Sequence, residues 1–140
     1  MAKDEFFLVG QKAFITNDKG ELLILVDPDR GLDLPGGKIQ EGEQDFDEAL
    51  RREVQEETGL EIKIGKPFIR WFRKGSPESE FEGKPFFIIG FFCKAETSDI
   101  ILSEEHTEYY WVNSNNYQEY KGEQGYLNAV KTFFQEYSDA

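Results

Sequence analysis

One segment of the chain is marked as a helix at both of its ends. Asp45 and Glu48 have the spacing of a capping box, in which polar side chains satisfy the free backbone groups of a first helical turn. Gly59 stands just past the last expected helical position, where glycine readily takes the left-handed conformation that ends a helix. The sequence therefore predicts a helix over residues 45–58, and the fold has to bury its apolar side.

Stretches rich in apolar and β-branched residues lie on both sides of that helix. A turn sequence at residues 17–20 joins the first two stretches and predicts an antiparallel hairpin. Strands are expected at residues 6–16, 21–26, 60–72, 84–95 and 108–112, with a short extended piece at 34–37. A second helix is expected from about residue 123 to residue 137, because its large apolar side chains recur at helical spacing.

This order of elements predicts one α+β domain over residues 1–140, in which helices flank a mixed sheet. The polar loop at residues 73–83 separates two of the strands and is a candidate mobile lid.

The composition narrows the class of partners. The formal net charge of -12 repels the phosphates of long nucleic acids and the surfaces of anionic membranes. Hydrophobic residues make up 39% of the 140 positions, which is enough for a packed core, and no apolar run reaches the ~20 residues of a membrane-spanning helix.

Cys93, the single cysteine, is expected to be a buried strand residue rather than a nucleophile. Because the start of the sequence lacks a signal-peptide pattern, a cytoplasmic protein is expected.

Three glutamates of the expected helix fall on its apolar side. With Glu53 set to zero and about 100° per residue, Glu57 lies at about 40° and Glu56 at about −60°. The wheel gives the same side to three apolar residues, Phe46, Ala49 and Leu50. Thr58 falls among the polar residues of the opposite side. The wheel therefore predicts that the three carboxylates point inward.

Inward carboxylates within one helical turn repel one another, and the dipole at the end of a helix disfavours negative charge as well. A hard divalent cation such as Mg²⁺ would offset this charge, because it binds carboxylate oxygens together with substrate phosphates. A solvated acidic face is the alternative, since the chain contains 28 Asp and Glu residues. The wheel favours metal binding.

The residues before and along this helix resemble a known motif. Residues 37–43 read Gly-Lys-Ile-Gln-Glu-Gly-Glu, and residues 52–60 read Arg-Glu-Val-Gln-Glu-Glu-Thr-Gly-Leu. Together they resemble the Nudix box, the signature of the Nudix hydrolases, at every fixed position of that pattern. The stretch between Glu43 and Arg52 has one residue more than the pattern. If the extra residue lies near Gln44, the helix keeps its phase, and the insertion affects the expected position of Glu43 alone.

The resemblance implies a fold and a set of roles. The fold is the Nudix fold, an α/β/α sandwich with a mixed sheet. The implied ligands of Mg²⁺ or Mn²⁺ are the three helix glutamates, Glu53, Glu56 and Glu57. Arg52 is the implied partner that orients these carboxylates. Gly36 and Gly37 form the implied loop that approaches the metal and the substrate closely, since glycine has no Cβ, and a simple turn is the alternative.

A later acidic segment is similar to the family pattern, in which an acidic residue precedes a strand with a tryptophan. The resemblance implies that Glu105, before Trp111, completes the metal site or acts as general base, with an exposed loop acid as the alternative. His106 is the only histidine, and no catalytic role is assigned to it. Basic residues near the box or the loop are candidate substrate contacts, with solvated surface as the alternative for each: Lys38, Arg70, Arg73 and Lys74.

The implied reaction is hydrolysis of a phosphoanhydride bond in a nucleotide-like small molecule, without a covalent intermediate. A nucleoside triphosphate cleaved to monophosphate and pyrophosphate is the first expectation, followed by ADP-ribose or another nucleoside diphosphate derivative. A non-catalytic nucleotide-sensing domain and a calcium-binding module are the other possible classes, and a homodimer is one option for the assembly. Aromatic residues could stack a base, although core packing is favoured for each: Phe14, Trp71, Phe72, Phe86 and Tyr109.

Overall fold

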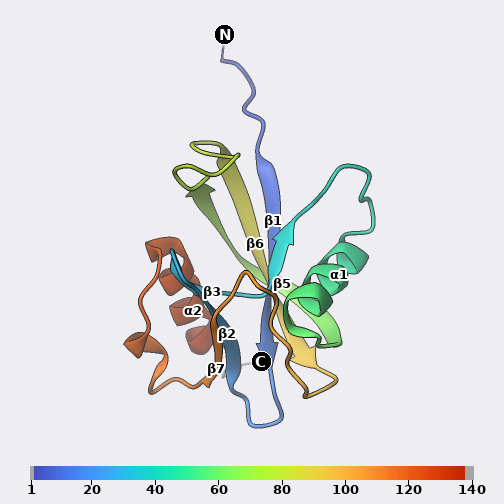
Figure 1. Cartoon of the computed structure of the whole chain (residues 1–140), viewed down its shortest axis with the longest axis vertical. Helices are drawn as coiled ribbons and strands as arrows, with labels where there is room; N and C mark the ends of the chain where they lie inside the picture. Colours follow the sequence, from blue (N-terminus) through green and yellow to red (C-terminus); the bar gives the residue numbers. More distant parts are fainter. Residues whose placement is uncertain (1, 138–140) are drawn as a thin grey trace.

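A mixed seven-stranded sheet forms the centre of the computed structural model, which describes residues 2–137 (Figure 1). The main strand order is β3-β2-β1-β6-β5, while β4 pairs with β1 and β7 pairs with β2. The strands are β1 (Leu8–Thr16), β2 (Leu22–Asp27), β3 (Gly31–Asp33), β4 (Gly36–Lys38), β5 (Ile62–Lys74), β6 (Pro85–Ala95) and β7 (Glu108–Val112). The helices are α1 (Phe46–Thr58) and α2 (Gln124–Tyr137), with a short 3-10 turn, η1 (Tyr117–Glu119), before α2.

The neighbours of β1 decide where the sheet opens. β1 runs parallel to β6 over its whole length. Its other edge pairs with β4 at residues 10–12 and meets β2 only at the Thr16–Leu22 pair. The predicted hairpin is confirmed at its turn, but the two strands separate beyond it because β4 occupies that edge of β1. A pocket can therefore form between β1 and β3, on the side where β2 diverges.

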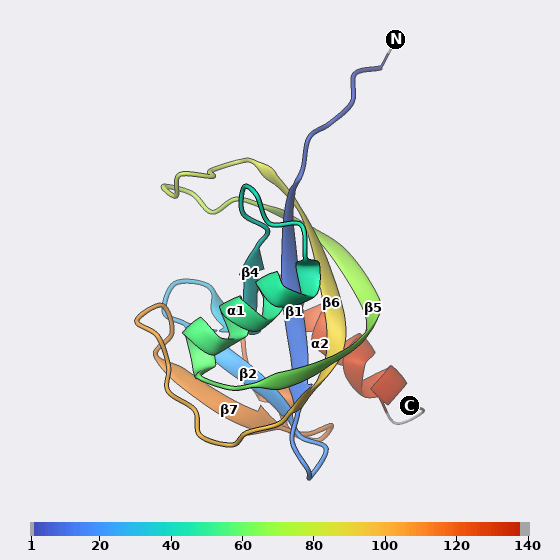
Figure 2. The same cartoon turned by 90° about the vertical axis from the view of Figure 1, so that its right-hand side faces the viewer.

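Two cores lie on opposite faces of the sheet, because side chains alternate along β1. Ala13 and Ile15 pack against the cluster of Leu50 and Val54 from α1. Phe14 belongs to the other cluster, which includes several residues of α2. Figure 2 shows α1 on the near side of the sheet and α2 behind it. The α/β/α sandwich with a mixed sheet, expected from the sequence, is confirmed.

Both predicted ends of α1 are confirmed. The Asp45 carboxylate accepts a hydrogen bond from the Glu48 N–H at 3.1 Å, and Gly59 has a φ of 74°. Two positions on the wheel were predicted wrongly. Phe46 is 57% exposed, because it starts the helix outside the cluster that buries Leu50 and Val54. Thr58 is buried, and its hydroxyl donates to the Val54 carbonyl at 2.7 Å, so its polar group is satisfied inside the core.

Most of the remaining elements follow the predicted order with small shifts at their ends, but β3 and η1 were not predicted. β5 continues to Lys74, two residues beyond the expected strand, and shortens the candidate lid to residues 75–84. Cys93 is buried, and burial raises the pKa of its thiol to about 12, as expected for a structural residue. Within residues 2–137 there is no helix long and apolar enough to cross a membrane.

Candidate active site

A pocket of about 390 Å³ opens where β2 and β3 diverge from β1. Its walls come from β1, β3, β4 and the inner side of α1, from the loop between β5 and β6, and from the segment that precedes β7. All three helix glutamates and Glu105 line it, as do Gly36 and Gly37. The structure therefore brings most of the predicted site residues together.

The three helix glutamates differ in burial, which the wheel did not predict. Glu57 is 4% exposed, and its carboxylate accepts a hydrogen bond from the Gly36 N–H at 3.1 Å. The Glu53 side chain is 16% exposed, and burial raises the pKa of its carboxyl, although Arg52 opposes that shift. The Glu56 side chain is 58% exposed at the rim. The prediction of inward carboxylates is confirmed for Glu57 and Glu53, while Glu56 lines the pocket from an exposed position.

The glycine pair of β4 lies directly against these carboxylates. A Cβ on Gly37 would stand 2.6 Å from the carboxyl carbon of Glu53, which is closer than real side-chain contacts allow. Gly36 has a φ of +138°, a conformation that favours glycine, and its N–H is the donor to Glu57. A close approach of backbone to carboxylates thus explains both glycines better than a simple turn.

Arg52 lies between three acidic side chains, a group named here the Arg52 clamp. Its guanidinium stands 3.2 Å from Glu53, 3.2 Å from Glu56 and 3.0 Å from Glu43. The Gln40 N–H also donates to Glu43 at 2.7 Å, and this bond, together with Arg52, lowers the pKa of the Glu43 carboxyl. The extra residue between Glu43 and Arg52 therefore does not separate the two side chains.

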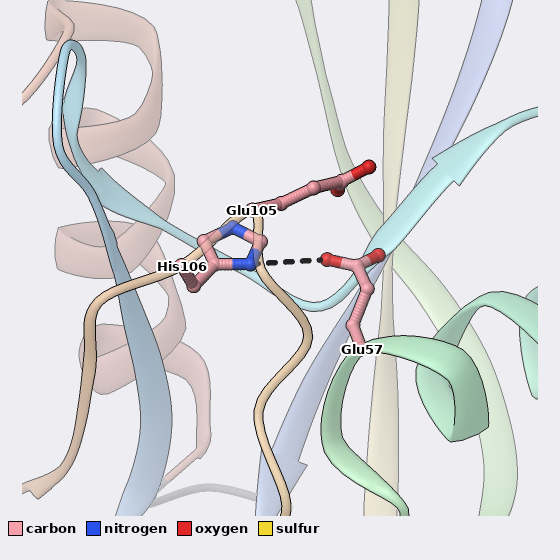
Figure 3. Close-up of side chains that lie close together, drawn as sticks. All are labelled: Glu57, Glu105 and His106. Atoms are coloured by element: carbon pink, nitrogen blue, oxygen red, sulfur yellow. Dashed lines mark ion pairs between the residues drawn. The ribbon is translucent and has the colours of Figure 1, made fainter.

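A buried network of charged side chains lies on the other side of Glu57. The Lys12 ammonium donates to Asp33 at 3.1 Å, and Asp33 accepts from His106 Nε2 at 2.9 Å. His106 Nδ1 stands 3.6 Å from the Glu57 carboxylate, as Figure 3 shows. The side chains of these four residues, the buried network, are each less than a tenth exposed. His106 thereby connects Glu57 of α1 to Lys12 of β1 and Asp33 of β3.

Burial and neighbouring charges set the protonation of the network. Burial raises the pKa of Glu57 to about 7, although Lys12 works against that shift. Burial alone would raise the pKa of Asp33, but the charge of Lys12 and the bond from His106 hold it well below its usual range. Burial alone would lower the pKa of His106, yet Asp33 raises it overall. A negative Asp33 therefore faces two basic groups.

Sequence reasoning missed three members of this network. No role was expected for His106, Lys12 or Asp33. The signal available was a charged residue inside an apolar stretch: Lys12 lies within the first expected strand, and Asp33 lies between two leucines. Such residues are seldom fully buried unless they are paired, so each indicated a buried partner that the sequence does not name.

The candidate basic residues are split between the pocket and the surface. Lys38 lines the pocket, and so does Arg73, which donates to Glu123 at 2.8 Å. Lys74 is exposed and is not part of the pocket lining. Arg70, predicted as a substrate contact, is likewise exposed and outside the pocket, because alternation along β5 points it away from the side of Arg73. The structure does not bring Arg70 to the other predicted residues.

The loop between β5 and β6 forms one wall of the pocket. The Gly75 N–H donates to the Lys84 carbonyl at 2.8 Å, so the base of the loop is held as a hairpin. Phe81 packs edge-to-face on Phe86, and the Lys38 ammonium lies 4.8 Å from the centre of the Phe81 ring. Of the candidate stacking aromatics, Phe86 reaches the pocket, whereas Phe14 is fully buried in the core. Movement of the loop stays a prediction.

Donor atoms suited to a divalent cation meet at one end of the pocket. One ligand atom each from Glu57, Glu105 and His106 lie within 4.8 Å of one another. In Figure 3 the Glu105 side chain comes from the same segment as His106 and lies near the Glu57 carboxylate. Carboxylate oxygens and an imidazole nitrogen are ordinary ligands of divalent metals, so the residues present fit such an ion.

Comparison with known proteins gives the family. The NUDIX domain matches residues 7–133 of the chain. A nucleoside triphosphatase NudI from Klebsiella pneumoniae subsp. pneumoniae is 30% identical over 116 residues, which cover 76% of this chain and 81% of that protein. The crystal structure of a MutT protein from Methanosarcina mazei superposes with a TM-score of 0.77 and 27% identity, covering 99% of this chain and 100% of that one.

A second solved structure supports the fold. An Ap4A hydrolase from C. elegans has a TM-score of 0.76 over 95% of this chain and 99% of its own, at 20% identity. The box, the sandwich around it and the match over nearly the whole chain agree with one another. The chain belongs to the Nudix hydrolase family.

Proposed function

We propose that this protein is a metal-dependent pyrophosphohydrolase that cleaves a nucleoside triphosphate to the monophosphate and pyrophosphate. The observation that carries the proposal is the meeting of the box glutamates with Glu105 in one pocket. A relative named a nucleoside triphosphatase, 30% identical over most of both chains, supports the choice of substrate class. ADP-ribose and other nucleoside diphosphate derivatives are the alternatives that the assay below separates.

In this proposal Mg²⁺ or Mn²⁺ is held by the carboxylates of Glu53, Glu56, Glu57 and Glu105, with the Gly37 backbone beside them. A bound cation of this kind neutralises phosphate oxygens and lowers the pKa of a coordinated water. It also reconciles an anionic substrate with a chain whose formal net charge is -12.

The residues of the chain itself position and activate the reactants. Arg52 fixes the Glu53 and Glu56 carboxylates, which lie within 3.2 Å of its guanidinium. Glu105 is exposed within the pocket lining and would complete the cation site. Lys38 and Arg73 supply positive charge on the walls where a triphosphate would lie. Water attacks phosphorus directly, and pyrophosphate leaves.

The decisive experiment is a substrate panel of nucleoside triphosphates, dinucleoside polyphosphates, ADP-ribose, NADH and nucleotide sugars, with products separated by chromatography. The proposal expects monophosphate and pyrophosphate from at least one triphosphate, only when Mg²⁺ or Mn²⁺ is present. Glu53→Gln should abolish the reaction, while Glu48→Gln, an exposed position on the same helix, should leave it unchanged. Full activity in EDTA would contradict metal dependence, and turnover of ADP-ribose alone would move the substrate to the alternative class.

A further inference from the structure

Among residues 2–137, one nitrogen of the single histidine is buried without a hydrogen-bond partner. The His106 side chain is 2% exposed, and its Nε2 is bonded to Asp33. Its other nitrogen, Nδ1, makes no hydrogen bond within the described residues although it is fully enclosed. Buried polar atoms are nearly always satisfied, so an atom like this one indicates a missing partner.

The bond to Asp33 decides which nitrogen carries the hydrogen. Asp33 is paired with the Lys12 ammonium at 3.1 Å, so it is a carboxylate that can only accept. Nε2 must therefore be the donor, and the neutral imidazole then presents a lone pair at Nδ1. That lone pair faces the Glu57 carboxylate, and a Glu105 carboxylate oxygen belongs to the same group of possible ligands. Electron-rich atoms on both sides of a gap leave room for a positive species between them.

The width of the gap matches a metal ion better than a proton. The 3.6 Å between Nδ1 and the Glu57 carboxylate is too long for a good hydrogen bond. Two metal–ligand bonds of about 2.1 Å at a tetrahedral angle would set their outer atoms about 3.4 Å apart. Glu57, Glu105 and His106 also all line the pocket.

The surroundings of the ring repeat a common arrangement of metal-binding histidines, in which the nitrogen away from the metal donates to a carboxylate. Asp33 fills that place, and Lys12 holds Asp33 with a further bond to the Leu34 carbonyl. The ring is thereby fixed with Nδ1 toward the pocket. The Asp33 carboxylate is an observation independent of Glu57 and Glu105, because it lies on β3 and is not one of the possible metal ligands.

We propose that His106 Nδ1 is a metal ligand in this chain, and that with Glu57 and Glu105 it forms a cation position of mixed nitrogen and oxygen donors. This extends the proposed function, on which it rests for the presence of a cation in the pocket. Imidazole favours Co²⁺ or Zn²⁺ over Mg²⁺, which prefers oxygen ligands throughout. The site should accordingly prefer Co²⁺ and Zn²⁺ over Mg²⁺ more strongly than an all-carboxylate site would.

The single histidine makes a direct test feasible with the unaltered protein. Imidazole ¹⁵N resonances of the full chain belong to His106 alone, so its tautomer and its metal contacts can be read without assignment ambiguity. The proposal expects the hydrogen on Nε2 and a large shift of the Nδ1 resonance alone when Zn²⁺ is added in stoichiometric amount. An Nδ1 resonance unchanged by saturating Zn²⁺ would overturn it.

Calorimetry with Co²⁺ and with Mg²⁺ gives a second measurement. His106→Gln should weaken Co²⁺ binding by roughly 10- to 100-fold and Mg²⁺ binding by less than about 3-fold. Glu104→Gln, an exposed neighbour in the same segment, is the matched control and should leave both affinities unchanged. Equal losses for the two ions would overturn the proposal.

The two proposals can fail separately. If the Nδ1 resonance shifts and the substrate panel is silent, His106 stands as a metal ligand and the proposed reaction falls. If a triphosphate is hydrolysed and the Nδ1 resonance does not shift, the proposed reaction stands and His106 is not a metal ligand.

Discussion

The Arg52 clamp and the buried network hold carboxylates of the same pocket by different physical means. The Arg52 side chain is 33% exposed, and its partners range from 16% to 58%. Lys12 and Asp33 are at most 9% exposed. Exposed ion pairs contribute little to stability because water screens them, whereas breaking a buried pair leaves an uncompensated charge. The Arg52 clamp can therefore orient its carboxylates with little effect on the free energy of unfolding. The buried network, in contrast, both holds Glu57 in the site and stabilises the fold.

Removal of the Glu57 charge, which belongs to the buried network and lines the pocket, should have the largest effect. Glu57→Gln keeps the shape of the side chain and the bond from the Gly36 N–H but lowers the charge available to a cation. We expect kcat to fall by roughly 1,000-fold or more, with the protein still folded. Steady-state kinetics at saturating Mn²⁺, beside a circular dichroism spectrum, measures both. Activity within tenfold of the unaltered protein would remove Glu57 from the cation site.

Asp33→Asn should show that the buried network, unlike the Arg52 clamp, contributes strongly to the free energy of unfolding. It leaves the Lys12 ammonium buried without an anion, so the free energy of unfolding should drop by about 3–5 kcal/mol. Urea denaturation followed by tryptophan fluorescence provides the number. Glu123→Gln is a suitable comparison, because Glu123 pairs with Arg30 and Arg73 while 38% exposed, and it should cost about 1 kcal/mol. Equal losses would show that burial does not distinguish the two kinds of pair.

Arg52→Ala should have the opposite effect, with a small change in the free energy of unfolding and a larger change in kcat. It removes contacts to Glu43, Glu53 and Glu56, so those carboxylates lose their common orientation. We expect unfolding to become easier by at most about 1 kcal/mol and kcat to fall by roughly 10- to 100-fold. Arg51→Ala, which breaks only the exposed pair with Glu48, is the control on the same helix. A large stability loss in Arg52→Ala would mean that the clamp also supports the fold.

The smallest expected effect is a pH dependence of the metal-free protein. Burial raises the pKa of Glu57 to about 7, above the 4.5 of an unfolded chain, so folding favours the protonated form. This contribution is complete below pH 4.5 and is lost as the pH rises toward 7, with a slope of at most about 1.4 kcal/mol per pH unit. The Tm in EDTA should fall over that window, and Glu57→Gln should fall less. Identical profiles would show that Glu57 does not titrate there.

Local patterns predicted much of the fold, and long-range contacts supplied the rest. The capped helix, the strand β7 and the confinement of Glu53 and Glu57 to the inner side follow from spacing alone. The parallel pairing of β1 with β6 does not, because it joins residues far apart in the chain. His106 and Asp33 are 73 residues apart, so only the folded chain shows that they meet. The burial of Phe46 and Thr58, the two positions that the wheel predicted wrongly, likewise depends on which elements pack against each end of α1.

The parallel pairing of β1 with β6 also orders events during synthesis. β1 leaves the ribosome early, but its parallel partner begins only at Pro85, and His106 follows later still. A nascent chain that ends after α1 already contains every glutamate of the box. It lacks β6, the parallel partner of β1. Contacts of such long sequence separation form slowly, and strand edges stay open meanwhile. The pocket that the box glutamates share with His106 is therefore complete only after β6 and the segment before β7 have joined the sheet.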